Sequence, residues 1–146
     1  MQVDFYHLGH APIEQVLPRI AERVVAAGGR LLVVAGDAGM LEALDRALWA
    51  YESDAFLPHG RAGQGGEAHQ PVLLSTIIDP QNGARNLALV DGQWRAEALG
   101  YDRAFHFFDD GSVDAAREAW RSLNGVADVE RRFWRQDPDG RWTRVA

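Results

Sequence analysis

Cysteine and lysine are both absent from this sequence of 146 residues. Without cysteine the chain can form no disulfide bond, no thiolate metal site and no cysteine nucleophile. All 15 basic residues are therefore arginine, and no lysine is present to meet a phosphate in a P-loop. Thiol chemistry and the Walker type of nucleotide site are excluded by these two absences.

Long apolar runs are absent as well. No segment approaches the ~20 apolar residues in a row that a transmembrane helix needs. The first ten residues, MQVDFYHLGH, lack the basic start and the apolar stretch of a signal peptide. These features favour a cytoplasmic protein of bacterial type with no membrane partner.

The chain is acidic overall, but its charge is unevenly distributed. The formal net charge is −6. Residues 1–110 carry 8 Arg against 15 acidic residues, a net of −7, and residues 111–146 carry 7 Arg against 6, a net of +1. Non-specific DNA binding needs a basic field that releases counterions, so we predict little direct DNA binding. A local cluster of arginines remains able to receive an acidic peptide.

Strand and helix patterns alternate along the first half of the chain. This order predicts an α/β domain with a mainly parallel sheet, and the length suits a single domain over residues 1–146. The last two strands flank Asp137-Pro138-Asp139-Gly140, which predicts a C-terminal hairpin. We expect strands at 3–8, 30–36, 71–78, 84–90, 104–108, 129–136 and 141–145, and helices at 13–27, 38–51 and 112–123.

Two details of this prediction are specific. Pro18 lies inside the first helix and should kink it or delay its start, while Pro12 suits its first turn. Residues 60–70, GRAGQGGEAHQ, are rich in glycine and are predicted to form a loop.

The segment VVAGDAGMLEAL, residues 33–44, has the strand–loop–helix order of a phosphate-binding site. It matches neither GxGxxG nor GxxxxGK[ST], and Asp37 at the helix start would repel a phosphate. A plain βα turn is the favoured interpretation, and a Rossmann-like nucleotide-binding enzyme using the Asp37 loop is the alternative. The histidines and acids show no ligand or acid–base spacing, so no cofactor, metal or catalytic residue is predicted.

The third helix carries the most informative pattern. Its buried face is predicted from alanines and a leucine, and an adjacent face is formed by Val113, Arg117, Trp120 and Arg121. Two guanidiniums one turn apart can hold carboxylates, and the indole and valine offer an apolar seat. The competing interpretation is a solvated arginine face with Trp120 in the core.

Residues 44–60, LDRALWAYESDAFLPHG, crowd apolar side chains around a connection that would normally be polar. One interpretation buries Phe56 and Leu57 in the sheet above Trp49. The other makes the segment a partner interface, in which aromatic residues are enriched. The residues alone do not decide between them.

The sequence resembles a known family, the chi subunit of bacterial DNA polymerase III. The resemblance covers nearly the whole chain, and its most specific part is LDxALW…FxPH combined with the terminal DGRW hairpin. It is carried by FYHL, LEALDRALWAYESDAFLPHG, QPVLLST, NGARNLALVDG, AREAWRSL and FWRQDPDGRW.

The resemblance implies a Rossmann-like three-layer fold without nucleotide chemistry. It also implies a non-catalytic accessory subunit that binds the acidic C-terminal tail of single-stranded DNA-binding protein and, through the psi subunit where present, the clamp loader. The family's tail-binding helix matches AREAWRSL, with Arg117, Trp120 and Arg121 at its functional positions. Val113 stands where some members carry a basic residue.

The psi-facing surface of the family corresponds to Trp49, Phe56, Leu57 and Pro58. By this resemblance, the aromatic residues of the 44–60 segment serve partly as core and partly as a docking surface.

Overall fold

The computed structural model describes residues 1–51 and 57–146. These residues form an eight-stranded sheet in the order β3-β4-β2-β5-β6-β1-β7-β8, in which only the β7–β8 pair is antiparallel. The strands are β1 (Gln2–His7), β2 (Leu31–Val34), β3 (His59–Arg61), β4 (Val72–Ser75), β5 (Asn86–Leu89), β6 (Arg103–Phe108), β7 (Glu130–Gln136) and β8 (Trp142–Arg144).

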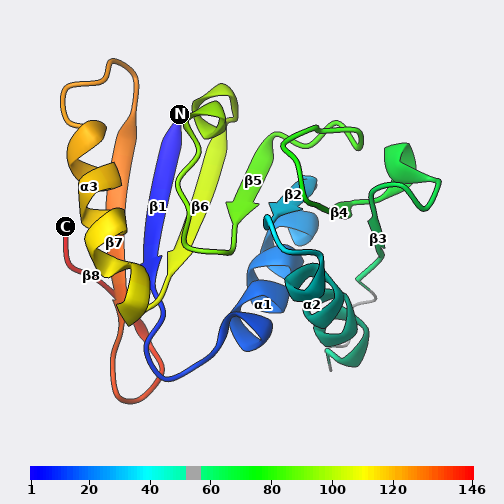
Figure 1. Ribbon diagram of the computed structural model, residues 1–146, viewed down its shortest axis with the longest axis horizontal. Coiled ribbons are helices and arrows are strands. Elements are labelled where there is room, and N and C mark those ends of the chain that lie inside the picture. Colours follow the sequence, from blue (N-terminus) through cyan, green and yellow to red (C-terminus); the bar gives the residue numbers. More distant parts are fainter. Residues whose placement is uncertain (52–56) are drawn as a thin grey trace.

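The helices are α1 (Ile13–Ala26), α2 (Ala38–Ala50) and α3 (Val113–Ser122), with short 3₁₀ turns η1 (Glu67–His69), η2 (Ala96–Gly100) and η3 (Asp110–Ser112). Figure 1 shows α3 beside β7 at one end of the sheet and α1 and α2 next to each other toward the other end. The predicted Rossmann-like α/β class with a C-terminal hairpin is confirmed.

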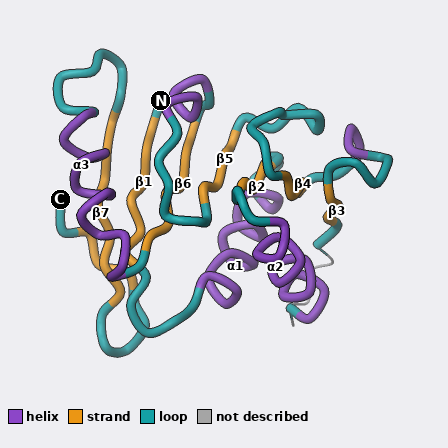
Figure 2. The backbone as a smooth tube through the Cα atoms, viewed as in Figure 1, coloured by secondary structure: helices purple, strands orange, loops and turns teal. Residues whose placement is uncertain are grey.

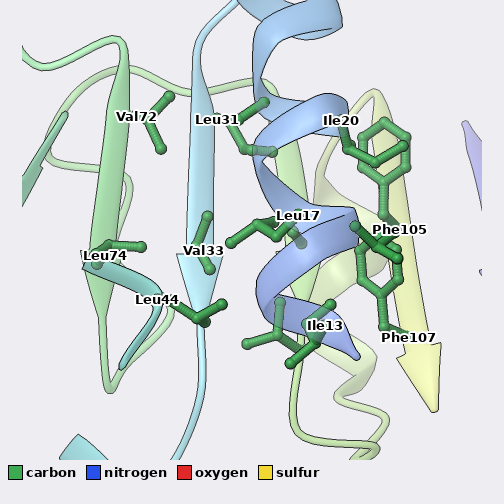
Figure 3. Close-up of a cluster of buried hydrophobic side chains, with 14 of the residues drawn as sticks. Ile13, Leu17, Ile20, Leu31, Val33, Leu44, Val72, Leu74, Phe105 and Phe107 are labelled. Carbon is green, nitrogen blue, oxygen red and sulfur yellow. The ribbon is translucent and has the colours of Figure 1, made fainter. Parts of the chain in front are cut away.

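Two apolar layers lie on opposite faces of the sheet because alternate residues of a strand point to opposite sides. In β1, Tyr6 belongs to the layer under α1 and α2, whereas Val3 and Phe5 belong to the layer under α3. Figure 3 shows Leu17 and Ile20 of α1 among the strand side chains of the first layer. The central strands are buried on both faces, as expected for parallel strands between helical layers.

Helix α1 begins at Ile13 with Pro12 as its N-cap, so the start is not delayed by Pro18. Pro18 is buried inside the helix, where it removes one backbone hydrogen bond without ending it. The helix ends at Ala26, one residue before the predicted end, and Gly28 and Gly29 follow it. Gly28 has φ +83°, and the N–H groups of Gly28 and Gly29 donate to the carbonyls of Val25 and Val24, each at 2.9 Å.

The sequence prediction missed β3. Its three residues, within or next to the expected glycine-rich loop, pair in parallel with β4 at the edge of the sheet. A strand of this length, containing Gly60, has no alternating pattern to detect. No helix in the described residues is long and apolar enough to cross a membrane.

Candidate functional site

Helix α3 is held close to the sheet by small residues. Ala116 and Ala119 are buried, and Leu123 closes the same face. Before α3, Asp109 and Ser112 form a reciprocal capping box at η3, with the Ser112 hydroxyl donating to Asp109 Oδ1 at 3.1 Å. These contacts fix the helix at its start and along its length. Figure 2 shows α3 beside β7.

Trp120 lies half-buried at the edge of this helix. Its ring meets Phe5 and Phe133 edge to face, with centroids 5.3 and 5.6 Å apart. These contacts fix the indole while leaving part of it at the surface. Trp120 is therefore partly packed in the core and partly exposed, and its role as an apolar seat for a ligand stays a prediction.

Arg117 and Arg121 are exposed on α3, one turn apart, with Val113 half-buried one turn before Arg117. Asp114 and Glu118 share the helix, yet within the described residues neither arginine forms an ion pair within 4.0 Å. Two guanidiniums beside an anchored indole can bind a carboxylate ligand without first breaking an ion pair within the described residues.

Arg131 of β7 adds a third guanidinium that sequence reasoning missed. Its Cζ lies 4.3 Å from the centroid of the Trp120 ring, and it donates to the Trp120 carbonyl and to Asn124 Oδ1 at 3.2 Å. The cation over the ring holds the indole against the sheet. Alternation along VERRFWRQ places Arg131 on the Phe133 side of the strand, and only the parallel pairing of β7 with β1 brings it under α3. We define Val113, Arg117, Trp120, Arg121 and Arg131 as the α3 face.

A second exposed aromatic lies at the end of α2. Trp49 is 66% exposed, and its ring centroid lies 4.6 Å from that of His59. His59 is buried, with Nδ1 3.1 Å from the Leu57 carbonyl oxygen and Nε2 3.0 Å from Asp45 Oδ1. Sequence reasoning did not single out His59, whose ring lies next to the indole, or Asp45, which lies next to His59. We define Trp49, Pro58 and His59 as the α2–β3 surface.

The structure separates the other residues predicted for this surface. Leu57 is only 8% exposed and belongs to the layer under α1 and α2, so its packing is accounted for by the core. Pro58 is half-buried beside His59. Phe56 lies outside the described residues. Among the described residues of this segment, Trp49 is thus the strongly exposed aromatic side chain.

The match to a known family covers most of the chain. Residues 1–128 match the model of the family described as DNA polymerase III chi subunit, HolC. This chain belongs to that family. Four residues of the α3 face lie within the matched residues, and Arg131 lies beyond them. The C-terminal hairpin also lies beyond them.

Curated relatives agree with the family assignment. The chi-family chain is 36% identical to DNA polymerase III subunit chi of Escherichia coli over 67 residues, 46% of each protein. It is 33% identical to the Pseudomonas aeruginosa subunit over 84 residues, 56% of this chain and 58% of that protein. A probable DNA polymerase III subunit chi of Rickettsia prowazekii is 21% identical over 152 aligned positions, covering 99% of this chain and 92% of that protein.

The aligned segments thus span about half the length of the Escherichia coli and Pseudomonas aeruginosa relatives. The matched family is described as a subunit of DNA polymerase III.

The alternative hypothesis of nucleotide binding would use the Asp37 loop. In this loop, backbone N–H groups already donate to the chain's own carboxylates. The Gly36 N–H donates to Asp91 Oδ2 at 2.9 Å, and the Gly39 N–H donates to Asp37 Oδ1 at 2.9 Å. Asp91 is also held by two hydrogen bonds from Arg95 at 2.9 and 2.8 Å. Burial by itself would raise the pKa of Asp91, but the bonds from Arg95 and from backbone N–H groups outweigh it and lower the pKa.

The crevice at the carboxyl ends of the strands, where Rossmann-like folds bind nucleotides, is acidic in this chi-family chain. Its lining includes Glu14, Asp37, Asp91 and Asp109. The amides that would cradle a phosphate already serve carboxylates, and four acids repel the anion. This arrangement does not favour the alternative hypothesis. Among the described residues, no group of three or more acids and histidines is placed to hold a metal ion.

Proposed function

We propose that this protein is a non-catalytic accessory subunit of DNA polymerase III. In this role it tethers the clamp loader and the replicase to the acidic C-terminal tail of single-stranded DNA-binding protein. The observation that carries the proposal is the pair of exposed guanidiniums of Arg117 and Arg121, which form no ion pair with the described part of the chain, beside the anchored Trp120 ring. Family membership adds the replication context. We place the protein in the cytoplasm, with little direct binding to DNA.

Each part of the α3 face meets a different part of such a tail. Arg117 and Arg121 pair with tail carboxylates through charge-assisted hydrogen bonds, which are stronger than neutral ones. Val113 and the exposed part of Trp120 receive the apolar end of the tail. The charge component makes the complex weaker at high salt, whereas the apolar component persists.

The first test titrates the protein into a fluorescent peptide that carries the last residues of the cognate single-stranded DNA-binding protein. Arg117→Glu is expected to weaken binding by about tenfold to a hundredfold, because a charged hydrogen bond becomes a repulsion. Fluorescence anisotropy at low and high salt measures the dissociation constants.

The matched control is Arg46→Glu, which makes the same charge change at an exposed arginine of α2. It should bind the peptide as the wild type does. Equal binding by Arg117→Glu and the wild type would move the tail site away from the α3 face. Loss of binding in both variants would show that net charge, and not this face, controls the affinity.

We further propose that the α2–β3 surface receives the psi subunit in organisms that have it. Trp49→Ala is expected to weaken psi binding by about tenfold or more, because exposed tryptophans are typical anchors of interfaces. The free energy of unfolding should change by less than about 1 kcal/mol, since Trp49 is 66% exposed. Calorimetric titration with purified psi and urea denaturation measure the two effects. Unchanged psi affinity in Trp49→Ala would reject the surface.

A further inference from the structure

A second arginine-rich surface lies on the opposite side of the sheet from α3. A groove of about 640 Å³ runs between α1 and the β7–β8 hairpin, and its lining includes Val16, Arg19, Arg23, Trp134, Arg141 and Trp142. A smaller cavity of about 320 Å³ shares Ile20 and Arg23 with it and extends toward Arg103. We name the larger space, with these six lining residues, the hairpin groove.

The apolar wall of the hairpin groove is rigid because Tyr6 and Asp4 of β1 hold it. Trp134 stacks on Tyr6 with centroids 6.2 Å apart, and Trp142 meets Tyr6 edge-on at 5.0 Å. The Trp134 indole N–H donates to Asp4 Oδ1 at 3.0 Å. Burial, followed by the charge of Asp4, raises the pKa of Tyr6 to about 12, so the ring stays neutral. Asp4 is fully buried and paired with Arg103 at 2.9 Å, so its charge is compensated inside the protein.

The rim of the hairpin groove is cationic. Arg19, Arg23 and Arg141 are exposed, and within the described residues none of them forms an ion pair within 4.0 Å. Among the described residues that line the groove, Asp139 is the one acidic side chain. Arg19 and Arg23 stand one turn apart on α1, a spacing at which like charges destabilise a helix. Because this pair of like charges lowers helix stability in a chain of net charge −6, we interpret it as a ligand-binding feature.

We infer that the hairpin groove binds an extended acidic peptide segment of a partner protein, with an apolar side chain of that segment seated against Trp134 and Trp142. The chemistry repeats that of the α3 face, where two arginines one turn apart flank a fixed indole. Charge complementarity selects acidic side chains, and the indoles supply the apolar contact. This inference does not depend on the function proposed for the α3 face.

A single-stranded nucleic acid fits the hairpin groove less well. Such ligands need a row of free aromatic faces on which successive bases stack. Here both indoles are packed against the same ring, Tyr6, one face-on and one edge-on. Asp139 and the overall negative charge also oppose a phosphate backbone. An acidic peptide carries fewer negative charges than a nucleic acid and needs only one apolar contact.

The test uses a fluorescent synthetic peptide of alternating aspartate and phenylalanine residues and the full-length protein. Calorimetry on the wild type is expected to detect binding at both the hairpin groove and the α3 face. The double variant Arg19→Glu, Arg23→Glu should weaken the groove component by about tenfold or more and leave the Arg117-dependent component. Arg46→Glu tests the effect of one Arg-to-Glu charge change outside the groove, which is half the change in the double variant. Arg19→Gln, Arg23→Gln replaces the double variant if its melting curve shows unfolding.

The variants distinguish this inference from the function proposed for α3. Loss of the groove component in the double variant, with that component retained in Arg117→Glu, supports the groove whether or not α3 binds a tail. Unchanged titration curves in both double variants would overturn the inference. Displacement of the peptide by oligo(dT) at a lower concentration than by unlabelled peptide would also overturn it, and would assign the groove to nucleic acid.

Discussion

Phe5→Ala is expected to lower the free energy of unfolding by about 4 kcal/mol. Phe5 is fully buried at the centre of an aromatic cluster, with Trp94, His106, Trp120 and Phe133 around it at centroid distances of 6.0, 5.3, 5.3 and 6.2 Å. Removing the ring leaves a cavity and takes one aromatic contact from each of the four neighbouring rings. Urea denaturation followed by tryptophan fluorescence and by circular dichroism measures the loss.

Phe5 also positions the α3 face, because its ring meets the edge of Trp120. We therefore expect Phe5→Ala to weaken binding of the acidic tail peptide under conditions in which the variant is still folded. Phe5→Leu is the control, since it keeps most of the buried volume and should cost about 1 to 1.5 kcal/mol. A loss below about 1 kcal/mol in Phe5→Ala would show that the cluster relaxes and does not hold α3 in place.

Acidification is expected to destabilise the protein through His106. This side chain is fully buried with no hydrogen-bond partner at either ring nitrogen within the described residues, and burial lowers its pKa from 6.5 to about 4. Between pH 6.5 and about pH 4, His106 is therefore protonated in the unfolded chain and neutral in the folded protein. Stability is fully present above pH 6.5 and falls as the pH drops through this window, by about 2 kcal/mol at about pH 5.

The control for this pH effect is His106→Leu, which removes the titrating ring and keeps an apolar side chain among Phe5, Trp94 and Phe108. Denaturation of both proteins across the window measures the slopes. The slope of the variant should be flatter than that of the wild type. Equal slopes would show that groups other than His106 cause the pH dependence.

Local sequence patterns predicted the elements that have strong periodicity of their own. The apolar repeat of α1, the short apolar run of β2 and the turn residues before β8 each specify one local structure. Pro18 did not delay the start of α1, which begins at Ile13, and the proline is buried inside the helix. Strand β3 escaped because three residues with a central glycine have no periodicity, and pairing with β4 alone defines them.

The candidate site was predictable only where a single helix carries it. Arg117 and Arg121 share a face through helical spacing, which sequence alone reveals. Arg131 joins them because β7 pairs with β1, and His59 meets Trp49 because β3 returns beside α2. These residues are distant in sequence, so no local pattern connects them.

The sequence by itself determined the α/β class, the lack of thiol and P-loop chemistry, and the arginine pair on α3, because composition and spacing along one element are local properties. Tertiary structure alone decided the depth of Trp120 and Leu57, the carboxylates that occupy the amides of the Asp37 loop, and the groove between α1 and the hairpin. The physical reason is that burial, hydrogen-bond partners and cavities arise between elements and depend on which strands become neighbours.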